Sequence, residues 1–147
     1  MQGNFQSEYH HLRSNLLRVS GWLRHEVNLI LEPFDITQQQ FNALRVLRGQ
    51  MKVVRVGAFS TNDLRDLLLD KSADTSRLVD RLVAKGLVSK EPCTIDSRRV
   101  NLKLTNEGTQ LLTDIDEKMG ELDAIFGDLP ETEARKLNLW LDRLGGS

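Results

Sequence analysis

The period of the apolar residues changes from helical to strand-like near residue 86 and returns to helical near residue 105. Before residue 86, apolar side chains recur at steps of three and four, as on one face of an amphipathic helix. Residues 87–92 and 99–104 alternate instead around the polar stretch 94–98, which predicts a β-hairpin with a charged tip. The fold class is therefore mostly α with one small β-hairpin.

Capping residues mark the expected ends of the first two helices. A helix over about residues 5–31 ends before Pro33, because the residue before a proline is disfavoured in the helical region. Thr37 and Gln40 fit a capping box at the start of a second helix, which ends near Gly49.

Two more helices are expected after the hairpin. Thr105 begins a long one whose stripe runs to Leu129, and Pro130 suits the first turn of the last one. The first and last helices present apolar faces that a monomer of 147 residues cannot fully bury. This predicts a homodimer.

The middle of the chain predicts a short strand and two short helices. The strand is expected near residues 58–60, and Ser60 or Thr61 caps the helix that follows. A break at residues 70–72 leads to another helix, which ends at Gly86. Two short helices followed by a hairpin favour a winged helix-turn-helix, whose second helix fits the major groove of DNA.

Candidate DNA contacts on that second helix are short polar residues at its start and basic residues along one side. They are Ser72, Thr75, Ser76, Arg77 and Arg81, with Lys85 continuing the basic row. We expect the short residues to be exposed, so that the backbone approaches base edges, and the basic ones to meet phosphates.

The hairpin tip supplies a second group of candidates. Arg98 and Arg99 have the length and charge to enter a minor groove or to bind the phosphate backbone. Asp96 lies two residues before Arg98 and is expected to hold its guanidinium group in a fork geometry.

The charge distribution agrees with a nucleic-acid partner, although the net charge is only −1. Residues 71–103 carry 8 basic and 4 acidic side chains, whereas residues 104–147 carry 4 basic and 10 acidic ones. Because screening limits the reach of each charge to about 8 Å at physiological salt, a polyanion responds to the local basic patch. The alternative is a winged-helix module that binds an acidic protein surface and not DNA.

Enzymatic function is not indicated. His10, His11 and His25 all lie on the first expected helix, and a spacing of 14 residues puts the last two about 21 Å apart, too far for one metal ion. Glycine-rich phosphate loops, zinc-protease motifs and nucleophile elbows are missing from the sequence. We therefore expect no catalytic residues, no metal and no cofactor.

Cysteine use and hydropathy indicate the compartment. The only cysteine, Cys93, excludes an intramolecular disulfide and suits a reducing environment. No apolar run approaches the length of about 18 residues that a transmembrane helix needs. The expectation is a cytoplasmic protein without a membrane partner.

The sequence over residues 64–108 resembles the MarR family of bacterial transcriptional regulators. Residues 75–88 are close to the family's recognition-helix pattern, and the wing motif Asp96-x-Arg98 is followed by Leu104-Thr105-x-x-Gly108 at the family's spacing. The resemblance implies one domain over 1–147, in which dimerisation helices at 1–35 and 106–147 flank a winged-helix DNA-binding lobe at 36–105.

The resemblance also implies a function. It indicates a homodimeric regulator, usually a repressor, that binds a pseudo-palindromic operator and is released by a small, often phenolic, ligand. Arg98 would be the minor-groove residue and Asp96 its partner, while Thr75, Ser76, Arg77 and Arg81 would lie along the major-groove helix.

Three points remain open at this level. Asp74 either caps the recognition helix or accepts a hydrogen bond from a cytosine amino group, and the cap is the favoured interpretation. Trp22, His25 and Phe41 either line a ligand crevice or pack in the core. Cys93 either packs inertly in a strand or senses oxidants, and inert packing is favoured.

Overall fold

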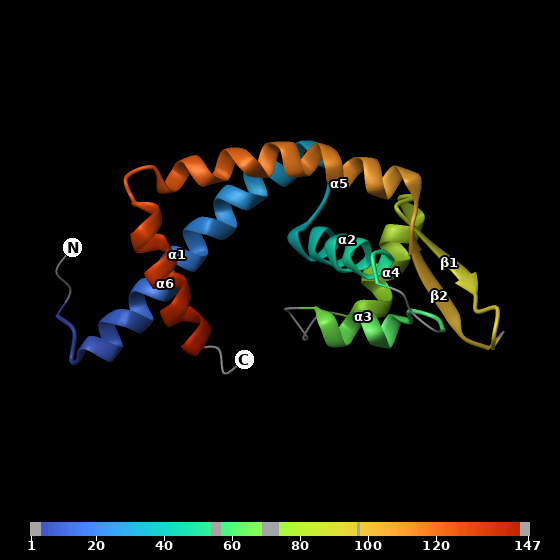
Figure 1. Ribbon diagram of the computed structural model, residues 1–147, viewed down its shortest axis with the longest axis horizontal. Helices are drawn as coiled ribbons and strands as arrows, with labels where there is room; N and C mark the ends of the chain where they lie inside the picture. Colours follow the sequence, from blue (N-terminus) through green and yellow to red (C-terminus); the bar gives the residue numbers. More distant parts are fainter. Residues whose placement is uncertain (1–3, 54–56, 69–73, 97, 145–147) are drawn as a thin grey trace.

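The computed structural model describes residues 4–53, 57–68, 74–96 and 98–144. It is mostly helical with one antiparallel hairpin, as the apolar periods predict (Figure 1). The elements are α1 (Glu8–Leu31), the 3-10 turn η1 (Glu32–Phe34), α2 (Gln38–Met51), α3 (Thr61–Leu67), α4 (Thr75–Ala84), β1 (Val88–Pro92), β2 (Val100–Leu104), α5 (Asn106–Met119), the 3-10 segment η2 (Gly120–Phe126) and α6 (Glu131–Leu144).

The elements form an arch with a lobe at one end. In Figure 1, α2, α3, α4 and the hairpin gather at one end, while α6 and the first half of α1 lie at the other. The segment from α5 to η2 runs along the top and connects the two ends. We refer to α2–β2 as the winged lobe and to α1 with α6 as the helical arm.

Helix starts follow the capping residues. The Thr37 hydroxyl accepts from the Gln40 amide at 3.1 Å and the Gln40 side chain accepts from the Thr37 amide at 3.2 Å, which completes the predicted capping box. Ser60, not Thr61, caps α3, with Asp63 as the reciprocal partner. Thr105 caps α5 by accepting from the Gly108 amide at 3.0 Å.

The end of α4 is closed by a two-bond turn. The Leu87 amide donates to the Leu82 carbonyl at 3.0 Å and the Gly86 amide to the Val83 carbonyl at 2.9 Å. Gly86 has φ of +73°, the left-handed conformation that this ending requires and glycine adopts without strain. Only three residues then separate α4 from β1, so the hairpin starts at a fixed position relative to α4.

A second glycine brings α5 onto this turn. A Cβ atom at Gly108 would lie 2.3 Å from the Leu87 carbonyl oxygen and 2.8 Å from a Leu104 methyl carbon. Neither distance is sterically possible without movement, so this contact between α5 and the α4–β1 turn depends on glycine. The C-terminal end of α4 therefore lies against α5, and its N-terminal end points away.

Two expected elements differ from the prediction. Residues 58–60 do not form a strand: the Phe59 carbonyl accepts from the Leu102 amide at 2.9 Å, and a single bonded residue beside β2 is too short to be one. The long helix after Thr105 ends as α-helix at Met119 and continues as η2. Gly120, which has low helix propensity, lies at the change.

The core belongs to the winged lobe and the α5 residues above it. Leu44, Leu64, Leu82, Leu112 and Ile115 are fully buried there. Leu31 is the one buried residue of α1, and no described residue of α6 is buried. None of the helices in the described part of the chain is long and apolar enough to cross a membrane.

Candidate nucleic-acid interface

One face of α4 packs into the core and the other is exposed. Leu78, Val79 and Leu82 are buried. The exposed residues are Ser76, Arg77, Asp80 and Arg81. Arg77 and Arg81 are one turn apart and thus neighbours on the exposed face. The first two members of the predicted basic row, Arg77 and Arg81, therefore lie as expected.

The expectation that Thr75 is exposed is wrong. Its side chain is only 1% exposed, and its hydroxyl has no hydrogen-bond partner among the described residues. Thr75 precedes Leu78, Val79 and Leu82 by three, four and seven residues, so helical geometry places it on the buried face. That spacing was visible in the sequence. The other short candidate, Ser72, lies outside the described residues.

Asp74 is the N-cap of α4. Its carboxylate accepts a hydrogen bond from the Arg77 amide at 3.2 Å, which confirms the favoured interpretation. The same carboxylate lies 3.7 Å from the Arg77 guanidinium, and both side chains are well exposed, so this ion pair is weak.

The remaining acid on the exposed face of α4 is paired. Lys90 of β1 contacts the Asp80 carboxylate at 2.5 Å, which joins α4 to the hairpin. This pairing reduces the repulsion that Asp80 would exert on a phosphate. Sequence spacing alone could not reveal it, because the two residues are brought together by the turn between α4 and β1.

Lys85 does not continue the basic row. Its ammonium group donates to the Asp35 carbonyl and to the Gln40 side-chain oxygen, and its side chain is 32% exposed. The prediction that Lys85 faces phosphates together with Arg77 and Arg81 is therefore wrong. Lys85 does follow Arg81 by one helical turn, but its flexible four-carbon side chain reaches inward at the end of α4.

The hairpin tip is organised by Asp96. Its side chain accepts from the Arg98 amide at 3.1 Å, and its carbonyl accepts from the Arg99 amide at 3.0 Å. The Arg98 guanidinium contacts the carboxylate through Nε alone, at 3.5 Å, so the predicted fork geometry is not formed. Arg98 remains 91% exposed. Asp96 thus fixes the backbone of the tip and leaves the guanidinium outward.

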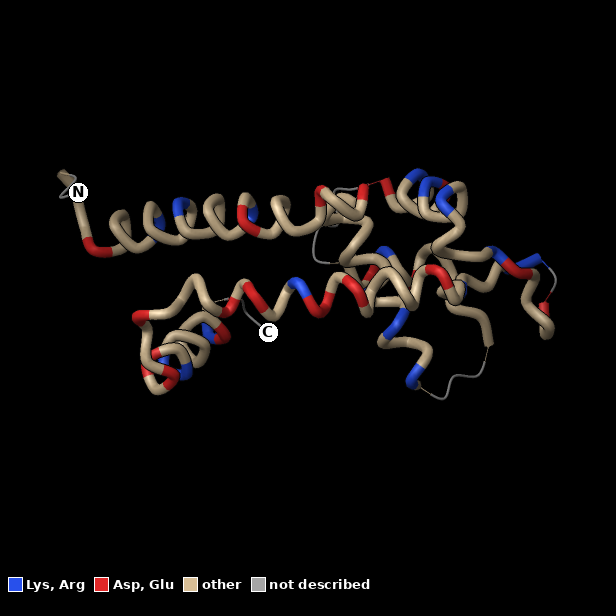
Figure 2. The backbone as a smooth tube through the Cα atoms, turned by 90° about the horizontal axis from the view of Figure 1, so that it is seen from above, with Lys and Arg blue, Asp and Glu red and all other residues tan. Residues whose placement is uncertain are grey.

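The tip and the start of α4 point in the same direction. The α4–β1 turn and the end of β2 both lie against α5, through Leu87, Leu104 and Gly108. The start of α4 and the hairpin tip therefore both extend away from α5, as Figure 1 shows. In Figure 2, Lys and Arg gather on α4 and the hairpin, whereas α5 and η2 carry mostly Asp and Glu.

Cys93 follows β1 at the base of the tip and is buried. Hydrogen bonds from the backbone of Asp96 and Ile95 lower the pKa of its thiol below the usual 9.0, and burial opposes them. Packing and thiolate stabilisation are therefore both present at this residue.

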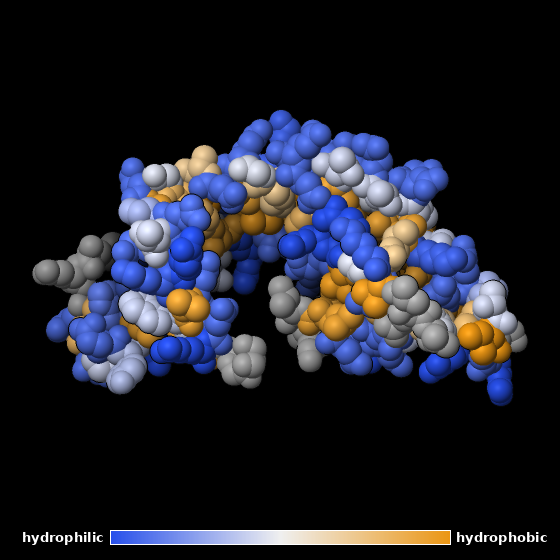
Figure 3. Space-filling model, viewed as in Figure 1, coloured by the Kyte–Doolittle hydropathy of each residue, from blue (hydrophilic) through white to orange (hydrophobic). Residues whose placement is uncertain are grey.

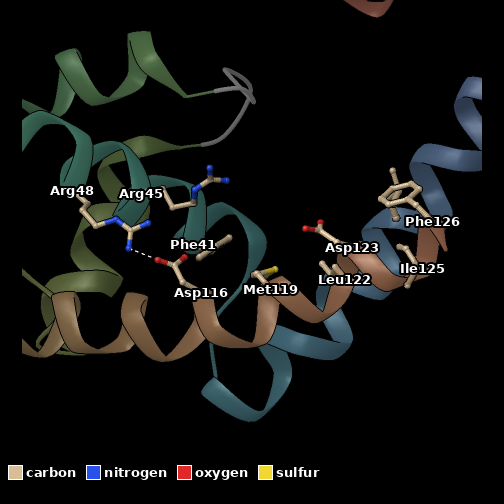
Figure 4. A pocket seen from close by; sticks show the side chains of 10 residues that line it. Phe41, Arg45, Arg48, Asp116, Met119, Leu122, Asp123, Ile125 and Phe126 are labelled. Carbon is tan, nitrogen blue, oxygen red and sulfur yellow. Dashed lines mark hydrogen bonds and ion pairs between the residues drawn. The ribbon is translucent and has the colours of Figure 1, made fainter. Parts of the chain in front are cut away.

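A cavity of about 330 Å³ lies between α2, the end of α5 and η2 (Figure 4). It is lined by Leu23, Phe41, Arg45, Arg48, Asp116, Met119, Leu122, Asp123, Ile125 and Phe126. Arg48 pairs with Asp116 at 2.6 Å across the cavity edge, and the Arg45 guanidinium lies 5.5 Å from the centre of the Phe41 ring. The cavity thus has largely apolar walls, with two arginines from α2 and the carboxylates of Asp116 and Asp123 among its lining.

Only one of the three residues predicted for a ligand crevice lines this cavity. Phe41 lines the cavity, but Trp22 and His25 do not. Trp22 instead packs edge-on against Phe126, with ring centres 6.2 Å apart. The two arginines of α2 were missed, because only the fold brings them opposite η2.

Within the described residues, no cluster of His, Cys, Asp and Glu is placed to hold a metal ion.

The arrangement of α3, α4 and the hairpin defines the class of protein: it is a winged helix-turn-helix. No protein-family model matches the chain. The HTH-type transcriptional regulator FarR of Neisseria gonorrhoeae is 31% identical over 116 residues, which cover 79% of this chain and 75% of FarR. The multiple antibiotic resistance protein MarR of Escherichia coli K12 is 32% identical over 95 residues, or 65% of this chain and 62% of that protein.

Solved structures show the same fold. A mutant MarR from E. coli complexed with operator DNA has a TM-score of 0.74 and 27% identity, covering 89% of this chain and 91% of that one. A putative MarR-like regulator from Bacillus cereus has a TM-score of 0.78 at 20% identity, covering 95% and 96%. The chain belongs to the MarR family of transcriptional regulators, as its sequence resemblance predicts.

Proposed function

We propose that this chain binds double-stranded DNA through α4 and the hairpin tip and so regulates transcription. The observation that carries the proposal is that the start of α4 and the hairpin tip extend in the same direction, away from α5. Both carry exposed cations: Arg77 and Arg81 on α4, and Arg98 and Arg99 at the tip. An α-helix fits the major groove, and a long cation at the wing reaches the minor groove or the backbone. The related MarR that is complexed with operator DNA supports it.

Each candidate residue has a role that its exposure permits. Ser76 faces base edges at the start of α4, and Arg77 and Arg81 bind phosphates. Arg98 enters the minor groove, with Asp96 holding the tip in shape, and Arg99 binds the backbone beside it. Thr75 is left out of this set, because its buried hydroxyl cannot reach a base without a change in the helix.

The test starts with duplexes that the parent protein enriches from its own genome. We expect Arg98→Ala to weaken binding of such a duplex by about 1–3 kcal/mol in fluorescence anisotropy. Lys118→Ala is the matched control, because Lys118 is an exposed cation in the last turn of α5, outside both α4 and the hairpin. Equal binding by the Arg98 variant and the parent contradicts the wing assignment.

Salt dependence tests the phosphate contacts. Each neutralised phosphate contributes about 0.9 to the slope of log affinity against log salt, so affinity should fall steeply as salt rises. A flat titration, or failure to enrich any duplex, would favour the winged-helix module that binds a protein partner.

We also propose a homodimer formed by the helical arm. Leu137, Trp140, Leu141 and Leu144 form a stripe on α6, and all are between 43% and 60% exposed. Leu12 and Leu16, in the first half of α1, are also exposed, and Figure 3 shows apolar surface at this end of the molecule. Light scattering at micromolar concentration should give twice the chain mass of 16.7 kDa, and the monomer mass contradicts the dimer.

The proposed mode of action is repression of a pseudo-palindromic operator that is relieved by a small anionic, phenolic ligand. The cavity between α2 and η2 supports a ligand of this kind, since its walls are largely apolar and Arg45 supplies a cation. Arg48 is already paired with Asp116, and Asp123 also lines the cavity, so the proposal depends on Arg45. Hydroxybenzoate should lower the anisotropy of the DNA complex, and Arg45→Ala should weaken that effect. In cells, deletion of the gene should raise transcription at the selected sites, and lowered transcription contradicts repression.

A further inference from the structure

The side chain of Lys85 links the end of α4 to the corner between α1 and α2. Lys85 is the C-cap residue of α4, fifty residues along the chain from Asp35. Its ammonium group donates to the Asp35 carbonyl and, at 3.3 Å, to the side-chain oxygen of Gln40. The Asp35 carboxylate lies 3.7 Å away.

The groups that Lys85 contacts are parts of the corner itself. Asp35 has φ of +53°, a left-handed conformation that ends η1 and reverses the chain toward α2. Gln40 is 4% exposed and closes the capping box of α2 with Thr37. Lys85 therefore binds the two features that set the direction of the chain where the arm helix α1 meets the winged lobe.

The carbonyl and amide oxygens matter more than the carboxylate here. The Asp35 side chain is fully exposed, so its ion pair with Lys85 is weak. A charged donor bound to a carbonyl and to a buried amide oxygen is stronger and has a defined direction. Arg77 differs, because its side chain is 80% exposed and remains available to a ligand. Lys85 is instead held by contacts within the fold.

We propose that Lys85 is a positioning residue, which fixes the angle between α1 and α4 by tying the end of α4 to the α1–α2 corner. The inference rests on the proposed function, in which α4 is presented to DNA and α1 belongs to the dimer. Since the corner lies between the two, the Lys85 contacts set the relative placement of the two copies of α4 in a dimer. Lys85 itself binds no phosphate.

Salt titration separates positioning from phosphate binding. The probe is a duplex that the parent enriches from a random library, and the variants are Lys85→Met and Arg81→Gln. We expect Lys85→Met to bind about tenfold more weakly with the parent's salt slope, because two charge-assisted hydrogen bonds are lost and no phosphate contact is. Arg81→Gln should lower the slope by about 0.9.

Operator spacing separates positioning from a general loss of stability. The parent should discriminate against duplexes whose half-sites are moved by one base pair, and Lys85→Met should lose most of that discrimination. A merely structural role weakens binding to all spacings equally. Lys85→Arg, which keeps a charged donor, should restore spacing selectivity. Lys85→Gln replaces the Met variant if the latter does not melt cooperatively.

The outcomes are distinct. A slope that falls by about 0.9 in Lys85→Met makes Lys85 a phosphate contact and overturns the proposal. Unchanged affinity, or equal weakening at every spacing, also overturns it. If the parent enriches no duplex, the proposed function fails and this inference fails with it. If Arg81→Gln loses binding and the Lys85 variant binds like the parent, only the positioning role is refuted.

Discussion

The winged lobe and the helical arm carry apolar stripes of the same kind but bury them to opposite extents. In the lobe, Leu44, Leu64 and Leu82 are completely buried. In the arm, Trp140 and Leu144 of α6 are about 60% exposed, and no described residue of that helix is buried. The lobe is thus stabilised by its own core, whereas a lone helix of 14 residues is marginal in water. In the proposed dimer, the partner subunit covers the exposed stripe of α6.

The largest effect expected from this difference is at the centre of the lobe. Leu82→Ala should lower the free energy of unfolding by about 2–5 kcal/mol at every protein concentration, because it leaves a cavity in a packed core. Trp140→Ala is the matched change in the arm. It should lower stability only at concentrations where the parent is dimeric, as measured by urea unfolding at several concentrations. A cost for Trp140→Ala that does not depend on concentration contradicts the comparison.

The junction between the lobe and α5 should be nearly as sensitive. Gly108→Ala places a Cβ atom against the Leu87 carbonyl, and relieving that overlap should cost about 1–3 kcal/mol in thermal unfolding. Gly49→Ala is the control, since a Cβ atom there has nothing within 4 Å. It should be neutral or stabilising within the helix α2.

A smaller effect is expected at the N-terminus of α4. Asp74→Ala removes a cap and should cost about 1 kcal/mol of stability, while Asp74→Asn keeps an oxygen acceptor and should restore most of it. If instead Asp74→Ala leaves stability unchanged and alters which bases the protein selects, then base reading outweighs capping at this residue.

The smallest effect is expected from pH. Because the folded protein lowers the pKa of the Cys93 thiol, the unfolded chain binds more protons than the folded one between the two pKa values. Stability should therefore rise slightly with pH up to about 9 and lose this contribution as pH falls through the folded pKa. Urea unfolding of the parent and of Cys93→Ala over pH 6–9 measures it, and identical slopes contradict it.

Features set by neighbouring residues could be predicted from the sequence. The capping boxes, the hairpin and the end of α4 at Gly86 depend on a few consecutive residues, and the structure has them. The buried position of Thr75 also follows from helical spacing, but its short polar side chain at the helix start favours the opposite expectation, that it is exposed.

Contacts between distant elements were not accessible in this way. The pair Arg48–Asp116 and the inward turn of Lys85 depend on how helices pack against one another, and the pair Asp80–Lys90 depends on how the α4–β1 turn places the strand beside the helix. Long basic side chains have many rotamers, so their periodicity along a helix does not determine their direction. The change from α-helix to η2 likewise depends on packing beside Gly120, and the stripe of apolar residues continues through it unchanged.

The three-residue connection between α4 and β1 has a consequence for recognition. Together with the Asp80–Lys90 pair, it limits how far the helix and the wing can move relative to each other. In the proposed complex, a shift of α4 by one base pair along the duplex would therefore also move the wing out of position in its groove. A mismatch at either element would then weaken the DNA contacts of both, so the affinity difference between correct and incorrect sites can exceed what either element achieves separately.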